Sequence, residues 1–215
     1  MMKRLIVFFL FPALILVSCT RNKTEFWPNG NKKSEIRMKG DHYEGVAQYW
    51  YEDGTLQTSC TYKNNKVDGV LKSYYPSGRL QAEQNYSAGM LNGQAKSWDK
   101  DRQLISECTY KNGKLNGKYT EYYPNKAVKF EGNYILGDHE GTWLYYDAAG
   151  MIVGEGFFTM GTGVQKAFYM NGVIKQLTHY TKNEKDGEEI FYKPDGVPEV
   201  INWFEHGKLV KKITK

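Results

Sequence analysis

The sequence predicts an all-β protein in which tandem 24-residue β-hairpins form one elongated, twisted, single-layer antiparallel sheet. Three observations predict this fold. A glycine recurs every 24 residues, with one interval of 22, and the fifth and seventeenth residues after it are aromatic in all seven units. Turn-forming residues separate arms rich in Tyr, Trp, Thr and Val. Beyond residue 19, no segment has apolar residues at helical spacing over three turns. The recurring glycines are Gly45, Gly69, Gly93, Gly117, Gly141, Gly163 and Gly187.

The first nineteen residues form a separate segment. Lys3 and Arg4 give it a positive start, and the apolar run 5–17 has the length of a secretory signal, which is short for a membrane span. The run ends in LVSC at residues 16–19, which resembles the lipobox of bacterial lipoproteins. This resemblance implies that residues 1–19 are a lipoprotein signal and that Cys19 is diacylated and becomes the new N-terminus. An ordinary secretory signal with an unrelated cysteine is the alternative.

The repeat array is predicted to begin shortly after that signal. Residues 20–25 are polar, and we expect them to form a short tether. The array then covers residues 26–215, because Phe26 and Gly30 fit the phase of an eighth, degenerate unit. Each hairpin adds two strands at roughly 4.8 Å each, so eight hairpins give a sheet on the order of 75 Å long. Such a sheet is elongated and twisted rather than globular.

Each unit contains two turns. The first follows the fifth-place aromatic residue and carries sequences such as Pro76-Ser77-Gly78. The second has glycine or asparagine at the twentieth place, where we expect a positive φ. The short unit lacks two residues before Gly163, and we expect this deletion to lie in a loop.

Composition and charge favour an exported binding module. The chain has 25% charged and 15% aromatic residues. Removing Lys3 and Arg4 from its 29 basic residues leaves 27 against 24 acidic ones, a net charge of about +3. That balance does not favour nucleic acid as a partner. The basic residues of the second turns are interpreted as a solvated edge, for example Lys63, Lys66, Lys111 and Lys114.

The two remaining cysteines are expected to be free thiols. Cys60 and Cys108 both occupy the fifteenth place of their units, two repeats apart. Stacked hairpins would separate them by roughly 19 Å, whereas a disulfide needs Cα atoms within about 7 Å. We therefore expect two small, half-buried side chains.

The sequence indicates no catalytic site, metal site or cofactor. The four histidines share no repeat position, and no nucleophile or metal-ligand motif is present. Glutamate recurs at the fourteenth place, and a two-residue first turn would place it opposite the third place. We therefore expect structural ion pairs, Lys72 with Glu83 and Lys96 with Glu107, and a protein that is not an enzyme.

Aromatic residues are predicted on both faces of the strands. Neighbouring residues alternate faces, so Trp50 points away from Tyr49 and Tyr51. The rings at the fifth and seventeenth places are expected to form the packed ladder. The additional rings either complete that packing, which we favour, or form a partner-binding face. These candidate binding residues are Tyr49, Tyr51, Tyr75, Tyr123, Tyr145, Tyr169 and Phe191.

One unit resembles a known repeat. The segment 110–125, YKNGKLNGKYTEYYPN, is similar to the MORN (membrane occupation and recognition nexus) repeat variant of bacterial YwqK-family antitoxins. The resemblance extends over about residues 26–210. It implies tandem β-hairpins and binding to another protein or to a membrane. The lipoprotein signal is a departure from that family's simple form, and it argues against a cytoplasmic antitoxin.

The sequence thus predicts a lipid-anchored repeat protein of the bacterial cell envelope that acts as a protein-interaction scaffold. Its partners would be an unidentified protein and a membrane, inner or outer, reached through acylated Cys19. We expect a monomer. The alternative is an envelope immunity or antitoxin protein that neutralises a toxin by direct binding. A third alternative is an enzyme, which loss of turnover on changing one carboxylate would support.

Overall fold

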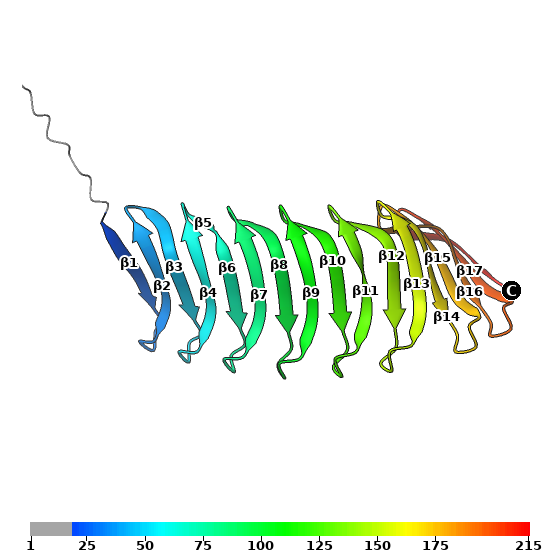
Figure 1. Ribbon diagram of the computed structural model, residues 1–215, viewed down its shortest axis with the longest axis horizontal. Helices are drawn as coiled ribbons and strands as arrows, with labels where there is room; N and C mark the ends of the chain where they lie inside the picture. Colours follow the sequence, from blue (N-terminus) through cyan, green and yellow to red (C-terminus); the bar gives the residue numbers. More distant parts are fainter. Residues whose placement is uncertain (1–18) are drawn as a thin grey trace, which may run out of the picture.

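The computed structural model describes residues 19–215, so all of the signal predicted for residues 1–19 except Cys19 lies outside the described part of the chain. Within this range the chain forms one open antiparallel sheet of 18 strands and no helix (Figure 1). Each strand pairs with its neighbours in the sequence, except that β4 pairs with both β5 and β6, which together make one hairpin arm. The predicted all-β class and the array of antiparallel hairpins are confirmed.

The strands follow the predicted repeat. Their bounds are β1 (Thr20–Phe26), β2 (Lys32–Lys39), β3 (His42–Trp50), β4 (Leu56–Lys63), β5 (Lys66–Val67), β6 (Gly69–Tyr74), β7 (Leu80–Ser87), β8 (Met90–Trp98), β9 (Leu104–Lys111), β10 (Lys114–Tyr122), β11 (Val128–Ile135), β12 (Asp138–Tyr146), β13 (Ile152–Thr159), β14 (Thr162–Phe168), β15 (Ile174–Thr181), β16 (Glu184–Tyr192), β17 (Pro198–Glu205) and β18 (Lys208–Thr214).

The segment 20–25, which we expected to be a tether, is a strand instead. It forms most of β1 and pairs with β2 from Thr20↔Lys39 onward, so the array begins directly after Cys19. Strand pairing uses backbone groups, and polar side chains are tolerated on a strand that is exposed on both faces. The loop that follows obeys the repeat plan, because Trp27 Nε1 donates to the carbonyl of Trp50 at 3.0 Å, 23 residues further on.

The second turns stack along one long edge of the sheet, here named the turn edge. Asn64 and Asn65 have φ values of 50° and 64°, and Asn112 and Gly113 have 51° and 81°. Two successive positive φ values define the type I′ hairpin turn, as expected for the twentieth place. Each turn also bonds to the hairpin before it, for example Gly113 N–H to the carbonyl of Leu91 at 2.8 Å.

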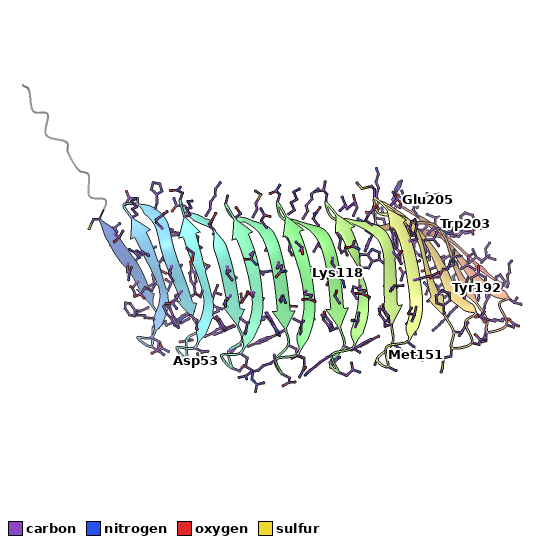
Figure 2. The ribbon with its side chains drawn as sticks, viewed as in Figure 1. Asp53, Lys118, Met151, Tyr192, Trp203 and Glu205 are labelled. Atoms are coloured by element: carbon purple, nitrogen blue, oxygen red, sulfur yellow. The ribbon has the colours of Figure 1, made fainter. Side chains whose placement is uncertain are left out.

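The first turns lie along the opposite long edge, here named the loop edge, where Figure 2 shows Asp53 and Met151. They are longer than the two-residue loop we considered: Tyr75 N–H bonds Arg79 O, and Gly78 N–H bonds Tyr75 O, both at 2.8 Å. A register shift at Ser73/Tyr74 compensates for the extra length. Because of this shift, Lys72 at the third place still lies opposite Glu83 at the fourteenth place, as predicted.

In the short unit, the two-residue deletion lies in a strand. We had expected it in a loop, and that expectation was wrong. In the other six units the phase glycine has a φ of 69–113°, and the strand carries a bulge there, as between the Gln84 and Tyr86 pairings of β7 with β8. Gly163 lacks the positive φ, and β13 pairs with β14 without any shift. The two missing residues are thus those of the bulge. Because bulges alter the local twist, strands β14–β18 turn away from the preceding row (Figure 1).

The sheet buries side chains mainly on one face, here named the packed face. Ile36, Ala47 and Cys60 are 6%, 0% and 4% exposed and form a cluster beneath half-buried tyrosines. Trp143 and Phe158 are buried where the sheet turns. Cys60 lies on β4 and Cys108 on β9, with three hairpin arms between them, as the repeat spacing predicted.

Candidate interaction surfaces

The seven candidate binding residues divide into two groups, all half-buried. The first group lies at the sixth place, where each hydroxyl donates to a backbone carbonyl 23 residues later, in the next unit. The bonds are Tyr51 to Tyr74 O (2.8 Å), Tyr75 to Trp98 O (2.9 Å), Tyr123 to Tyr146 O (2.8 Å) and Tyr169 to Tyr192 O (2.7 Å). These tyrosines join consecutive units along the loop edge.

Aspartate takes the same place in two other units. Asp99 Oδ1 accepts from the backbone N–H groups of Asp101 and Gln103, and Asp147 Oδ1 accepts from that of Ala149. These carboxylates order their own loop instead of joining it to the next. The sequence contains a signal for this structural role of the sixth place, since that place holds either tyrosine or aspartate in six of seven units.

The second group, Tyr49, Tyr145 and Phe191, lies on the packed face with the seventeenth-place rings. The Tyr49 and Tyr62 hydroxyls are 3.4 Å apart, and the Tyr145 ring is 5.9 Å from that of Phe130. Burial raises the pKa of both Tyr49 and Tyr145. The fifth-place rings lie on the other face, so the fifth and seventeenth places belong to two separate ladders.

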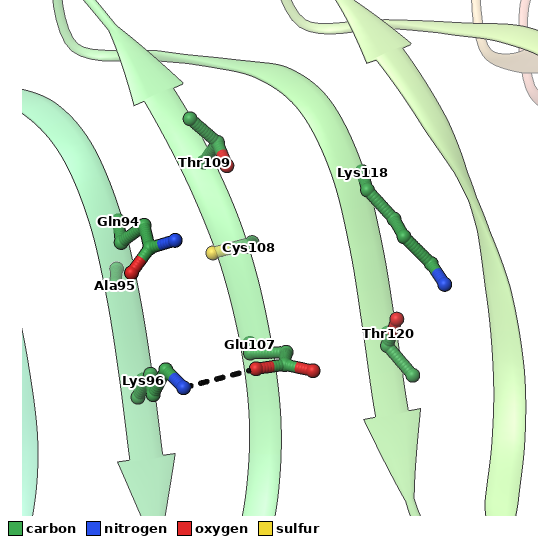
Figure 3. A pocket seen from close by; sticks show the side chains of 8 residues that line it. All are labelled: Gln94, Ala95, Lys96, Glu107, Cys108, Thr109, Lys118 and Thr120. Atoms are coloured by element: carbon green, nitrogen blue, oxygen red, sulfur yellow. Dashed lines mark ion pairs between the residues drawn. The ribbon is translucent and has the colours of Figure 1, made fainter.

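That other face carries the predicted ion pairs and is here named the ladder face. Lys72 Nζ lies 3.1 Å from Glu83 Oε2, and Lys96 Nζ lies 3.2 Å from Glu107 Oε2 (Figure 3). Tyr122 donates to Glu107 at 2.6 Å, and this bond lowers the pKa of Glu107 despite partial burial. All four charged groups of the two pairs are well exposed and screened by water, so the pairs add little to stability.

A hollow of about 220 Å³ lies over this part of the ladder face. Gln94, Lys96, Glu107, Lys118 and Thr120 line it (Figure 3). Both lysines are engaged, since Lys118 Nζ lies 2.8 Å from Glu131 Oε2. Residues 19–215 hold no group of three or more His, Cys, Asp or Glu side chains placed to bind a metal ion.

Beyond the Lys166–Glu155 ion pair, one row of the ladder face becomes apolar. Leu177, Ile190 and Ile201 occupy the places that hold Lys and Glu in earlier units, and they lie opposite one another on β15, β16 and β17. In the next row Phe157 is 67% exposed, and Trp203, labelled in Figure 2, is 39% exposed. We missed this apolar patch in the sequence, although the change from Lys/Glu to Leu/Ile at the third and fourteenth places signals it. The apolar patch comprises Phe157, Val164, Leu177, Ile190, Ile201 and Trp203.

A buried carboxylate lies on the packed face of the same strands. Glu189 is 4% exposed and receives bonds from Lys185 Nζ, Gln176 Nε2 and Asn202 Nδ2. Burial alone would raise its pKa, but these donors hold the pKa below the ordinary value. This network fixes three strands to one another.

Cys19 is exposed and directly precedes β1. The other residues of its predicted lipobox, 16–18, lie outside the described part of the chain, so acylation stays a prediction. Residues 19–215 contain no helix long and apolar enough to cross a membrane.

An open sheet of stacked hairpins defines a class, the β-hairpin repeat proteins. Four segments match the family model of the MORN repeat variant, residues 43–64, 67–88, 115–135 and 162–182. These matches support the MORN repeat family, whose repeats commonly serve as modules for interaction with proteins or membranes.

Two further comparisons add little to the family match. No curated protein matches the chain. The crystal structures of TcdB2-TccC3-Cdc42 and TcdB2-TccC3-TEV align over 86% and 87% of it, at 11% and 12% identity and a TM-score of 0.23 each. The chain spans 12% of those proteins' length.

Proposed function

We propose that the protein is a lipid-anchored scaffold of the bacterial cell envelope that binds another protein through its sheet surface. The apolar patch carries this proposal. Contiguous exposed apolar side chains commonly mark interaction sites, and aromatic anchors concentrate binding energy. Phe157 and Trp203 lie in one row of the ladder face, which also holds Val164, His179 and Glu188, and leave 67% and 39% of their surfaces open. The half-buried Leu177, Ile190 and Ile201 form the adjoining apolar row.

The anchor in this proposal is an acylated Cys19. Because β1 begins at Thr20, no tether separates the anchor from the array. The first hairpin would then lie at the membrane surface, and the apolar patch, on strands β13–β17, would lie at the far end of the sheet (Figure 1). This arrangement presents the patch away from the anchor.

Crosslinking and co-purification of the membrane-bound protein from its host test the proposal. We expect one protein to be recovered with the wild type and lost with Phe157→Ser/Trp203→Ser. The matched control is Val46→Ser/Val70→Ser, because both valines are exposed in the same row of the ladder face on earlier strands. Equal recovery with both double variants would overturn the role of the patch.

The same experiment addresses the candidate tyrosines and the alternative function. Loss of the partner with Tyr75→Leu/Tyr123→Leu, which removes both rings, would assign binding to the sixth-place rings as well. Recovery of a toxin that the protein inactivates would favour the envelope immunity or antitoxin alternative. Recovery of no protein at all would contradict the scaffold proposal.

A further inference from the structure

Three of four consecutive turns of the turn edge place basic side chains directly opposite each other. The register pairs two lysines across the β4–β5 turn and two across the β9–β10 turn, and a lysine with a histidine across the β2–β3 turn. All six side chains are exposed. We name this set the basic edge, and it comprises Lys39, His42, Lys63, Lys66, Lys111 and Lys114.

The fold makes little use of these groups beyond a 2.8 Å contact between His42 Nδ1 and Asn65 Nδ2. Like charges directly opposite in a sheet are destabilising, and no ion pair joins any of the five lysines to a carboxylate of residues 19–215. The ladder face shows the contrary arrangement, in which Lys72 lies opposite Glu83. The solvated edge that we expected from the sequence therefore contains two like-charged lysine pairs, which an external anion would stabilise.

The edge also exposes apolar side chains in line with the lysines. Met90, in the turn between the two lysine pairs, is 49% exposed, and Ile135 and Leu136 in the turn after them are 41% and 51% exposed. Inorganic polyphosphate would pair with the lysines and leave these side chains in water. A polypeptide with both carboxylates and apolar groups would cover the whole row.

We infer that the basic edge binds an acidic, apolar-containing segment of the partner protein. Consecutive turns are two strands apart, and the turn with Met90 lies between the second and third basic turns. The basic edge therefore covers three such intervals, roughly 29 Å, which about nine residues of extended chain would span. Lysine suits this role as a mobile point charge that does not demand planar, bidentate geometry. The inference rests on the proposed function, since it supplies the chemistry of the partner.

Fluorescence anisotropy tests the inference with the intact protein and a labelled peptide of about 12 residues that alternates glutamate with leucine and methionine. We expect binding that weakens as salt rises. Changing the four lysines of the two lysine pairs to glutamine should raise the Kd about tenfold or more. The matched control changes the same number of exposed lysines elsewhere to glutamine and should alter the Kd less than about twofold. Those control lysines are Lys100, Lys126, Lys175 and Lys193.

Three further arms decide the chemistry. A peptide with glutamine in place of glutamate should not bind. Inorganic polyphosphate or phosphatidylglycerol vesicles binding as tightly as the acidic peptide would overturn the choice of a protein segment. If the test and control variants lost peptide affinity equally, the effect would come from net charge alone, and the basic edge would not be a binding site.

A single variant separates binding from folding. Lys111→Glu should raise the midpoint of thermal unfolding, because an attractive pair with Lys114 replaces a repulsive one, and should weaken peptide binding. A raised midpoint with unchanged binding would overturn the inference. The scaffold proposal is tested by a different experiment, the recovery of the native partner with Phe157→Ser/Trp203→Ser. Failure of one proposal can therefore be distinguished from failure of the other.

Discussion

At the scale of single residues, Trp143 shows how one large side chain depends on small neighbours. A Cβ atom at Gly132 would lie 2.1–2.6 Å from the Trp143 ring, and the ring cannot move because it is 1% exposed. Gly132→Ala should therefore destabilise the protein by about 1–3 kcal/mol. The control Gln84→Ala, at the same place two units earlier, should cost about 0.5 kcal/mol or less. Chemical denaturation measures both, and equal costs would contradict the tight fit.

Glu189 predicts a pH dependence with a defined sign. Its pKa in the folded state is lowered, so its network contributes stability above the unfolded value of about 4.3 and loses it as pH falls through the folded value. Glu189→Gln should flatten the fall in unfolding free energy below about pH 4.3 and cost about 1–2 kcal/mol at neutral pH. The control Glu83→Gln removes an exposed pair and should change stability by about 1 kcal/mol or less. If the unfolding free energy of Glu189→Gln fell with acid as steeply as that of the wild type, the lowered pKa of Glu189 would be contradicted.

At the scale of structural elements, the sixth-place tyrosines join one hairpin to the next. Tyr75→Phe removes only the hydroxyl bond to Trp98 O and should cost about 0.5–1.5 kcal/mol. Trp98→Ala and Tyr110→Ala remove rings of the two ladders and should cost about 3 kcal/mol or more. Denaturant unfolding of the three variants compares them. A Tyr75→Phe cost equal to that of Trp98→Ala would mean that the hydroxyl bond, and not ring packing, holds the hairpins together.

The missing bulge predicts an engineered change of shape. Inserting two residues between Thr162 and Gly163 restores the 24-residue spacing and should restore the bulge. The extended row would then continue past β13, and the maximum dimension from X-ray scattering should increase. Asn183 should also lose its 2.8 Å contact with His139 Nδ1, which spans two units. An insertion of the same length at Ala148-Ala149, in a loop, should leave the dimension unchanged.

The hairpins were predictable because their signals are local and repeated. The glycine period, the aromatic places and the turn residues fix strand register, and register fixes the Lys72–Glu83 pair. The bulge at the phase glycines was not predictable, because a strand with two extra residues and a longer loop have the same sequence spacing. β1 was missed for a related reason: a polar strand has no apolar alternation, and only its pairing with β2 orders it. The apolar patch was missed because it depends on which places lie opposite one another.

At the scale of the whole molecule, stacking in sequence order predicts the state of the thiols. Cys60 and Cys108 stay free because three hairpin arms separate β4 from β9. With Cys19→Ser, denaturing and non-reducing alkylation should therefore find two thiols. Alkylation of the native protein should be slow at neutral pH, since burial raises the pKa of both groups. One intramolecular disulfide would contradict the order of the strands.

The position of Cys19 relative to the sheet leads to the last prediction. If the lipobox is processed, the mature chain begins at Cys19, one residue before β1, and the whole array is held by that residue. Each buried CH₂ of the acyl chains contributes about 0.8 kcal/mol, so a diacylated cysteine should hold the protein in the membrane fraction until detergent is added. Cys19→Ser should abolish acyl labelling and release the protein, whereas the control Cys60→Ser should retain the label, because Cys60 lies buried within β4. Mass spectrometry of the N-terminal peptide provides the direct measurement. An unmodified N-terminus at another residue would refute the anchor and leave the interaction surfaces to be tested on an exported, unanchored array.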